Sequence, residues 1–352
     1  MSMNSNLTAL WCEIAAGTAK GYARDLAAQA GVSEAQVVAA GCGGNGVTRL
    51  DVDWIAQLPI LESLGEVKII TRNDSIVHEK VGSFAKISVT GTMGLVLNGE
   101  VDLRLFLGHW NHTFHVCVDS RHGPRQAIQV FDIHGEAVHK IYRTDATDAA
   151  AWDALVSAFT AADQSPTLAV APPRRKLDPR ADDAIDVSGL RASWAAMTDV
   201  HHFHSMLQEY GVDRHQALRL AGTDYAREVT GDALSQVLRA VQASQLPFMI
   251  FVGNTGCIQI HTGPIQRVME KDAWVNVMDP RFNLHARADL IHSAWVVVKP
   301  TREGVITALE LYDSDNRNVA ILVGERQPGT PERADWRALL HGLPGIDASK
   351  AA

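Results

Sequence analysis

The stretch "AGVSEAQVVAAG" at residues 30–41 recurs, with one residue inserted, as "YGVDRHQALRLAG" at residues 210–222. Other segments repeat at an offset of 181: "FHV" (114–116) aligns with "WVV" (295–297), and "QVFD" (129–132) falls within "LELYD" (309–313). Each copy spans about 160 residues, which is too long for a solenoid repeat. The chain is therefore predicted to be a duplicated domain.

Within each copy, helical spacing of apolar residues gives way to strand patterns. The first ~50 residues of a copy show three- and four-residue spacing, with Gly31 and Gly211 as helix stops. Runs such as "HTFHVCVD" (112–119) and "AWVVVKP" (294–300) follow, separated by turn signals such as "DIHG" and "TREG". We predict an α+β tandem duplication, each copy an N-terminal helical segment followed by a large antiparallel β-sheet and a closing helix.

The segment between the copies is rich in proline, charge and small residues, which is typical of a linker. The predicted organisation is a first repeat over residues 1–162, a linker over 163–189, a second repeat over 190–345 and a tail over 346–352.

Composition excludes several classes of protein. A net charge of −8 argues against nucleic acid as a partner. Four scattered cysteines without a CxxC pair favour reduced thiols over a disulfide framework. The first residues lack a secretory leader pattern, and no run reaches the ~20 apolar residues of a membrane span. We expect a cytoplasmic protein that is not embedded in a membrane.

The most unusual local pattern is "DVHHFHSML" (199–207), three histidines in an otherwise amphipathic helix. At about 100° per residue, His201 is predicted on a flank shared with Trp194 and Met197, His204 lies nearer the apolar face, and His202 points away. The three cannot converge on one small ion from a regular helix. They are either core and surface histidines or a functional site.

The first repeat favours the functional alternative, because its stretch "TAKGYARDLAAQAG" contains no histidine. The sequence has no HExxH pattern, which disfavours a zinc hydrolase. A haem iron would suit these residues, since it takes one imidazole per face and lies in a broad apolar slot. Its two propionates then need cationic partners.

Three cations are candidates, each with a solvated surface charge as the alternative. Arg104 interrupts the alternating run "VDLRLFLGHW" (101–110), so it points away from Leu103 and Leu105. Arg214 follows Asp213, a plausible helix N-cap, and a first-turn cation is unfavourable there without a nearby anion. Lys299 ends a predicted strand in "VVVKPTREG".

The runs "FVGNTGCIQIHTGPIQRV" (251–268), "VDLRLFLGHWN" (101–111) and "HHFHSML" (201–207) closely resemble the haemin-degrading HemS/HmuS/ChuS family of cytoplasmic haem-trafficking proteins. The resemblance extends from about residue 6 to residue 343. The triple histidine is most similar to the PhuS-type haem chaperones of that family.

The resemblance implies haem b as ligand or substrate and assigns roles by motif. His201 matches the axial iron ligand and therefore the metal ligand of the site, with His204 or His202 as alternative ligands during transfer. Arg104 matches the arginine on the opposite haem face, where it would be catalytic if the protein is an enzyme.

The same motifs place Arg214 and Lys299 at positions that neutralise propionates, and Phe106 and Phe251 at aromatic wall positions. Three functions stay open. The first is a chaperone that accepts haem from an inner-membrane importer and delivers it to a haem oxygenase. The second is an enzyme that opens the porphyrin with an external electron donor. The third is an interaction scaffold without haem.

Overall fold

The computed structural model describes residues 3–120, 123–174, 178–327 and 329–346. It divides into two compact units: Met1–Arg72, Glu79–Arg175 and Gly253–Gln259 form the first, and Asn73–His78, Lys176–Val252 and Ile260–Ala352 form the second. Each unit thus contains a short segment from the other half of the sequence, which contiguous repeats do not predict. Residues 175–177 of the predicted linker and 347–352 of the predicted tail lie outside the described residues.

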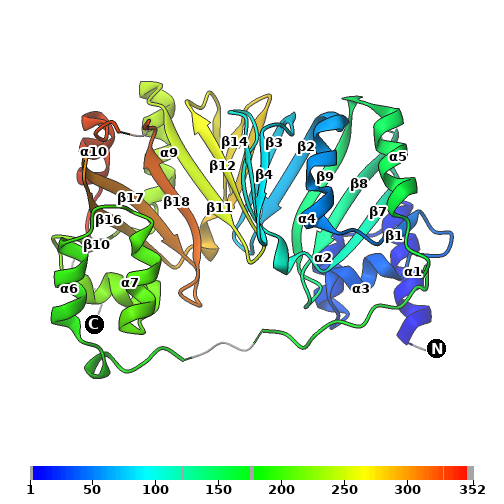
Figure 1. Cartoon of the computed structure of the whole chain (residues 1–352), viewed down its shortest axis with the longest axis horizontal. Coiled ribbons are helices and arrows are strands. Elements are labelled where there is room, and N and C mark those ends of the chain that lie inside the picture. The colour runs from blue at the N-terminus through cyan, green and yellow to red at the C-terminus, as the bar shows by residue number, and fades with distance from the viewer. Residues whose placement is uncertain (1–2, 121–122, 175–177, 328, 347–352) are drawn as a thin grey trace. The chain divides into compact units, whose positions relative to one another are not determined.

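The first unit begins with helices, continues with strands and closes with a helix (Figure 1). Its helices are α1 (Met3–Ala15), α2 (Ala23–Gln29), α3 (Glu34–Ala39), α4 (Trp54–Gln57) and α5 (Ala149–Phe159), with 3-10 turns η1 (Leu58–Leu64) and η2 (Leu107–His109). Its strands are β1 (Val47–Leu50), β2 (Gly65–Arg72), β4 (Ile87–Thr90), β5 (Met93–Leu97), β6 (Asp102–Phe106), β7 (His112–Ser120), β8 (Gly123–Phe131) and β9 (Ala137–Thr147).

The second unit repeats this order. Its helices are α6 (Val187–Ala195), α7 (His202–Tyr210), α8 (Arg214–Ala221), α9 (Ala233–Ser244) and α10 (Ala334–His341), with 3-10 turns η3 (Asp182–Ala184) and η4 (Ala288–Leu290). Its strands are β10 (Ala226–Val229), β11 (Phe248–Gly253), β13 (Val268–Lys271), β14 (Trp274–Met278), β15 (Phe282–Arg287), β16 (Ser293–Thr301), β17 (Gly304–Tyr312) and β18 (Asn318–Gly324). The residues of β3 (Ile76–Ser83) and β12 (Cys257–Gly263) are divided between the units.

The strand pairing confirms the predicted antiparallel class and the duplication. In the first unit the order is β1-β7-β8-β9-β2, with a separate meander β4-β5-β6. In the second it is β10-β16-β17-β18-β11, with a meander β13-β14-β15. The two orders correspond strand for strand, so both copies fold by the same plan.

Each larger sheet carries a core on both faces, because neighbouring strand residues point in opposite directions. In the first unit Val130 packs in a core with the closing helix α5, whereas Phe131 packs with α1–α3. In the second unit Leu311 packs with α9 and α10, whereas Tyr312 packs with α6–α8. The N-terminal helices of each copy therefore cover one face of its sheet, and the closing helix, joined by α9 in the second unit, covers the other.

The helix ends follow from local chemistry. Ser33 and Asp213 are N-caps whose side chains accept the backbone N–H of Gln36 and Gln216. Gly211 ends α7 in the left-handed region at φ +59°, and Gly31 follows α2 at φ +70°, as the sequence predicts. These turns place α3 and α8 against corresponding faces of their sheets.

Candidate functional site

The histidine stretch does not continue the helix that contains Trp194. Helix α6 ends at Ala195, residues 197–199 are irregular, and α7 begins at His202 with His201 as its N-cap residue. The predicted flank that His201 shares with Trp194 and Met197 is therefore wrong. Asp199 explains the break, since its carboxylate bonds the nearby backbone and so favours a turn over helix interior.

His201 lies at the surface with its ring held in place. Asp199 Oδ1 accepts hydrogen bonds from the His201 backbone N–H at 2.9 Å and from His201 Nδ1 at 2.7 Å. Those two bonds, the backbone one foremost, lower the pKa of the Asp199 carboxyl. The His201 side chain is 86% exposed, so its ring is available to a ligand from solvent.

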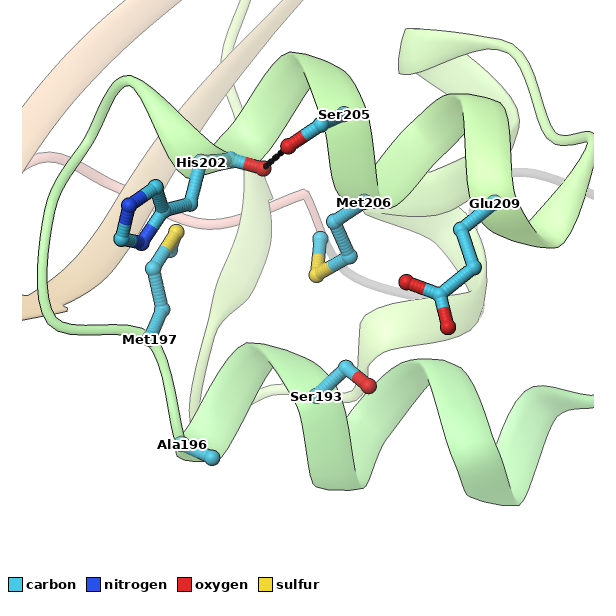
Figure 2. A pocket seen from close by; sticks show the side chains of 7 residues that line it. All are labelled: Ser193, Ala196, Met197, His202, Ser205, Met206 and Glu209. Carbon is cyan, nitrogen blue, oxygen red and sulfur yellow. Dashed lines mark hydrogen bonds between the residues drawn. The ribbon is translucent and has the colours of Figure 1, made fainter.

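The other two histidines are in different surroundings. His202 is exposed and lines a shallow pocket between α6 and α7, where its ring lies beside Met197 (Figure 2). That pocket has a volume of about 190 Å³, below the ~300–1,000 Å³ of ordinary ligand pockets. His204 is exposed on α7. The pocket at His202 is thus too small to hold a porphyrin.

A buried charged cluster lies beneath α7 in the second unit. Glu310, fully buried on β17, accepts hydrogen bonds from Arg214 Nε at 2.7 Å and Nη2 at 2.6 Å. Lys299 Nζ and the Tyr312 hydroxyl each donate to the same carboxylate at 2.7 Å. Arg214 and Lys299, both predicted from the sequence to neutralise propionates, therefore share one carboxylate partner that the sequence does not reveal. The Arg214 side chain is 30% exposed, whereas that of Lys299 is only 8% exposed.

The cluster changes the ionisation of its members. Burial alone would raise the pKa of Glu310, but Arg214 and Lys299 outweigh it and hold that pKa well below its usual range. Burial lowers the pKa of Lys299 to about 8 despite the attraction of Glu310. At neutral pH the two cations and one carboxylate leave an excess positive charge, which suits an anionic ligand.

Phe203 links this cluster to the histidine-bearing turn. Its ring is buried, with Lys299 Nζ at 4.3 Å and the guanidinium carbon of Arg214 at 5.0 Å from its centroid. Both contacts are cation–π interactions, in which a positive charge is attracted to the face of an aromatic ring. Because Phe203 follows His201 and His202 directly in the chain, the cluster anchors the start of α7.

The remaining candidates lie on strands. In the first unit, Arg104 and Phe106 occupy the half-buried side of β6, while Leu103 and Leu105 are buried, as the alternation predicts. Arg104 Nη1 donates to Asp102 Oδ1 and to the Leu103 carbonyl at 3.3 Å. In the second unit, Phe251 lies on the half-buried side of β11.

Three residues that contact the candidate site residues are not predicted from the sequence: Asp199, Phe203 and Glu310. Glu310 has a usable signal, a carboxylate within the apolar strand run "ITALELY" (306–312), since a buried charge requires a paired cation. Asp199 has a signal in the sequence as well, because a carboxylate two residues before a histidine can accept a hydrogen bond from the ring. Phe203 looks like any other core residue in sequence.

The structure also bears on two expectations from composition, the reduced thiols and the lack of a membrane span. All four cysteines are free, and burial raises the pKa of Cys257 to about 12, so it stays a protonated thiol. No helix in the described part of the chain is long and apolar enough to cross a membrane.

Comparison with known proteins identifies relatives over nearly the whole chain. Residues 31–159 and 211–343 match the family described as the "Haemin-degrading HemS.ChuX domain". The hemin transport protein HmuS of Yersinia pestis is 42% identical over 338 residues, covering 95% of this chain and 96% of that protein.

Two solved structures are similar in fold and sequence. Holo-PhuS, a heme-binding protein from Pseudomonas aeruginosa, matches with a TM-score of 0.93 and 42% identity, covering 97% of this chain and 99% of that chain. ChuS, a heme degrading enzyme from Escherichia coli O157:H7, matches with a TM-score of 0.88 and 38% identity, with the same coverage.

Proposed function

Since the chain belongs to the haemin-degrading HemS/ChuX family, we propose that it binds haem b in the cytoplasm and delivers it to a haem oxygenase for release of the iron. The haem would arrive through an inner-membrane importer. The observation that carries this proposal is the exposed imidazole of His201, whose Nδ1 already bonds Asp199 and whose Nε2 can therefore act as a ligand.

The donor set of the second unit fits a haem. A neutral imidazole is an axial haem ligand, and the excess positive charge around Glu310 suits a propionate. We assign contact with the ligand to Arg214, because its side chain is partly exposed. Lys299 is buried, so we assign it a supporting role in which it keeps the local charge positive. Phe251 supplies an aromatic wall position.

Arg104 and Phe106 are carried over from the family motif, Arg104 to the second haem face and Phe106 to the wall. A guanidinium stays protonated and donates hydrogen bonds, so Arg104 can hold an oxygen-containing ligand but cannot itself bind iron. Bound haem supplies the redox chemistry. His204 and His202 serve as alternative iron ligands while haem is passed on.

Haem degradation by the protein itself is the second candidate, favoured by its similarity to ChuS, which is described as a heme degrading enzyme. The two functions differ in their dependence on peroxide. An enzyme converts haem to one defined bilin with catalase present, whereas a carrier loses conversion when peroxide is scavenged. In the enzyme, Arg104 would be the catalytic group.

Haemin titration followed by stopped-flow mixing with a haem oxygenase tests the proposal. We expect a Soret band to develop with saturating stoichiometry, and haem to leave for the oxygenase faster than it leaves for bulk solvent. Absence of a Soret band would favour an interaction scaffold. Catalase-insensitive conversion to a single bilin without an added oxygenase would favour the enzyme.

A further inference from the structure

We propose that Asp199 is a positioning residue that selects His201, among the three neighbouring histidines, as the ligand of the haem iron. This inference rests on the proposed function and names a determinant of it. Asp199 achieves the selection by holding the His201 ring in one orientation with Nε2 free.

The geometry fixes the tautomer. One carboxylate oxygen accepts both the backbone N–H and the Nδ1–H of His201, at 2.9 and 2.7 Å. An ionised carboxylate can only accept, so Nδ1 must carry the proton and Nε2 must carry the lone pair. The backbone bond closes a short turn that keeps the carboxylate beside the ring.

The neighbouring histidines lack this arrangement. Within the residues that the structure describes, neither His202 nor His204 forms a hydrogen bond with a carboxylate. Of the three, His201 alone therefore has a defined tautomer. Since a metal-bound histidine usually donates its other ring N–H to a carboxylate or carbonyl, His201 is prepared for iron before the ligand arrives.

The contact has little value for stability. The His201 and Asp199 side chains are 86% and 52% exposed, so the hydrogen bond between them contributes little to folding. The first repeat, aligned on Gly31 and Gly211, has Ala19 and Gly21 at the two corresponding positions. The carboxylate and the imidazole are thus both absent from the copy that lacks the histidine cluster, which fits a shared role.

The experiment compares the wild type with Asp199→Ala and Asp199→Asn. Asp186→Ala serves as the matched control, because Asp186 also accepts a nearby backbone N–H and bonds no histidine among the residues that the structure describes. Without haem, ¹⁵N NMR of the imidazole should show the Nδ1–H tautomer of His201 in the wild type and the control. Asp199→Ala should convert it to a mixture, and Asp199→Asn, which keeps an acceptor, should lie between.

With haemin, Asp199→Ala should lose about 10- to 100-fold in affinity and shift the iron–histidine stretching band of the reduced complex. Adding His204→Ala to Asp199→Ala should alter the haemin spectrum further, because the choice of histidine is open once Asp199 is lost. If Asp199→Ala keeps the tautomer of His201 and the affinity for haemin, the inference about Asp199 is overturned but the proposed function is not. A wild type that binds no haemin, with its Nδ1–H tautomer intact, would overturn the proposed function as well.

Discussion

The two repeats share a scaffold down to single hydrogen bonds. Ser33 caps α3 and Asp213 caps α8 at corresponding positions, and each side chain accepts the N–H of the residue three places further on. Val130 and Leu311 occupy equivalent core positions beneath the closing helix of their unit. The features common to both repeats are those that any copy of the fold requires.

The repeats differ at the face covered by their N-terminal helices. At four positions the second repeat has an ionisable or hydroxyl side chain, whereas the first repeat has a side chain of another type or of opposite charge. Arg214, Lys299, Glu310 and Tyr312 of the second repeat correspond to Glu34, Val118, Gln129 and Phe131 of the first. The first repeat instead pairs buried Glu34 with Lys140, and Arg72 and Arg24 also act electrostatically on Glu34.

The difference teaches that the fold does not need the four-residue cluster. A sheet of the same topology is covered by helices in the first repeat without any charge at the position of Glu310. The cluster of Arg214, Lys299, Glu310 and Tyr312 and the three neighbouring histidines of residues 201–204 have no counterpart in the first repeat, and we propose that they serve a ligand rather than packing. This comparison can be tested position by position.

The largest expected effect on stability comes from replacing Glu310 with glutamine, the residue type of its counterpart Gln129 in the first repeat. Glu310→Gln should lower the free energy of unfolding by about 3–5 kcal/mol, because it leaves two cations without their carboxylate. Adding Lys299→Val, the residue of the first repeat, should recover part of the loss. Urea denaturation of the single and double variants measures both. A loss below about 1 kcal/mol for Glu310→Gln would contradict the described cluster.

Acid should destabilise the first repeat by protonating His139 on unfolding, an effect that the second repeat lacks because its counterpart is Ala320. His139 is buried, and burial lowers its pKa from 6.5 to about 3. Between those values the unfolded chain binds a proton that the folded chain does not, so stability falls as pH falls. Lowering the pH from 6.5 to 5 should cost about 2 kcal/mol through this group.

Denaturation curves of His139→Gln at pH 7 and pH 5 measure this contribution. The variant should lose less stability on acidification than the wild type, whereas the exposed control His341→Gln should lose the same amount. Equal acid sensitivity in His139→Gln and the wild type would show that His139 is not held neutral by burial.

The shared N-caps should give smaller and matched effects. Ser33→Ala and Asp213→Ala should each cost about 1 kcal/mol, since each removes one acceptor from the first turn of a helix. Thermal unfolding of the two variants compares the caps directly. A large difference between the two costs would show that the repeats do not share this part of the scaffold.

The smallest effect on stability is expected at Arg104, whose counterpart is His285. Arg104 is half-buried, and in the described part of the chain it bonds only groups on its own strand, so Arg104→Ala should change stability by less than about 0.5 kcal/mol. It should nevertheless alter the absorption spectrum of the haemin complex, and His285→Ala should not. Identical spectra for Arg104→Ala and the wild type would remove Arg104 from the site.

Much of the fold follows from the sequence because its signals are local. Alternation predicts which side of β6 is buried, and Gly31 and Gly211 mark the helix ends. The segments 73–78 and 253–259, which each group with the other unit, depend on contacts distant in sequence that no local pattern reveals.

The site is only partly predictable for a related reason. The histidines and cations stand out in sequence, and family membership agrees with the resemblance seen in their motifs. Glu310 lies 96 residues after Arg214, so only the structure shows that they share a hydrogen-bonded cluster. The helix break before His201 was also missed, because hydrophobic spacing does not record that Asp199 bonds to the backbone.

A crystal structure of the protein with haemin tests the central claim most directly, namely that the second repeat alone supplies the axial ligand. We predict density joining the iron to Nε2 of His201, with Nδ1 still bonded to Asp199 and a propionate beside Arg214. Iron bound by a residue of the first repeat, or a porphyrin far from α7, would contradict the account.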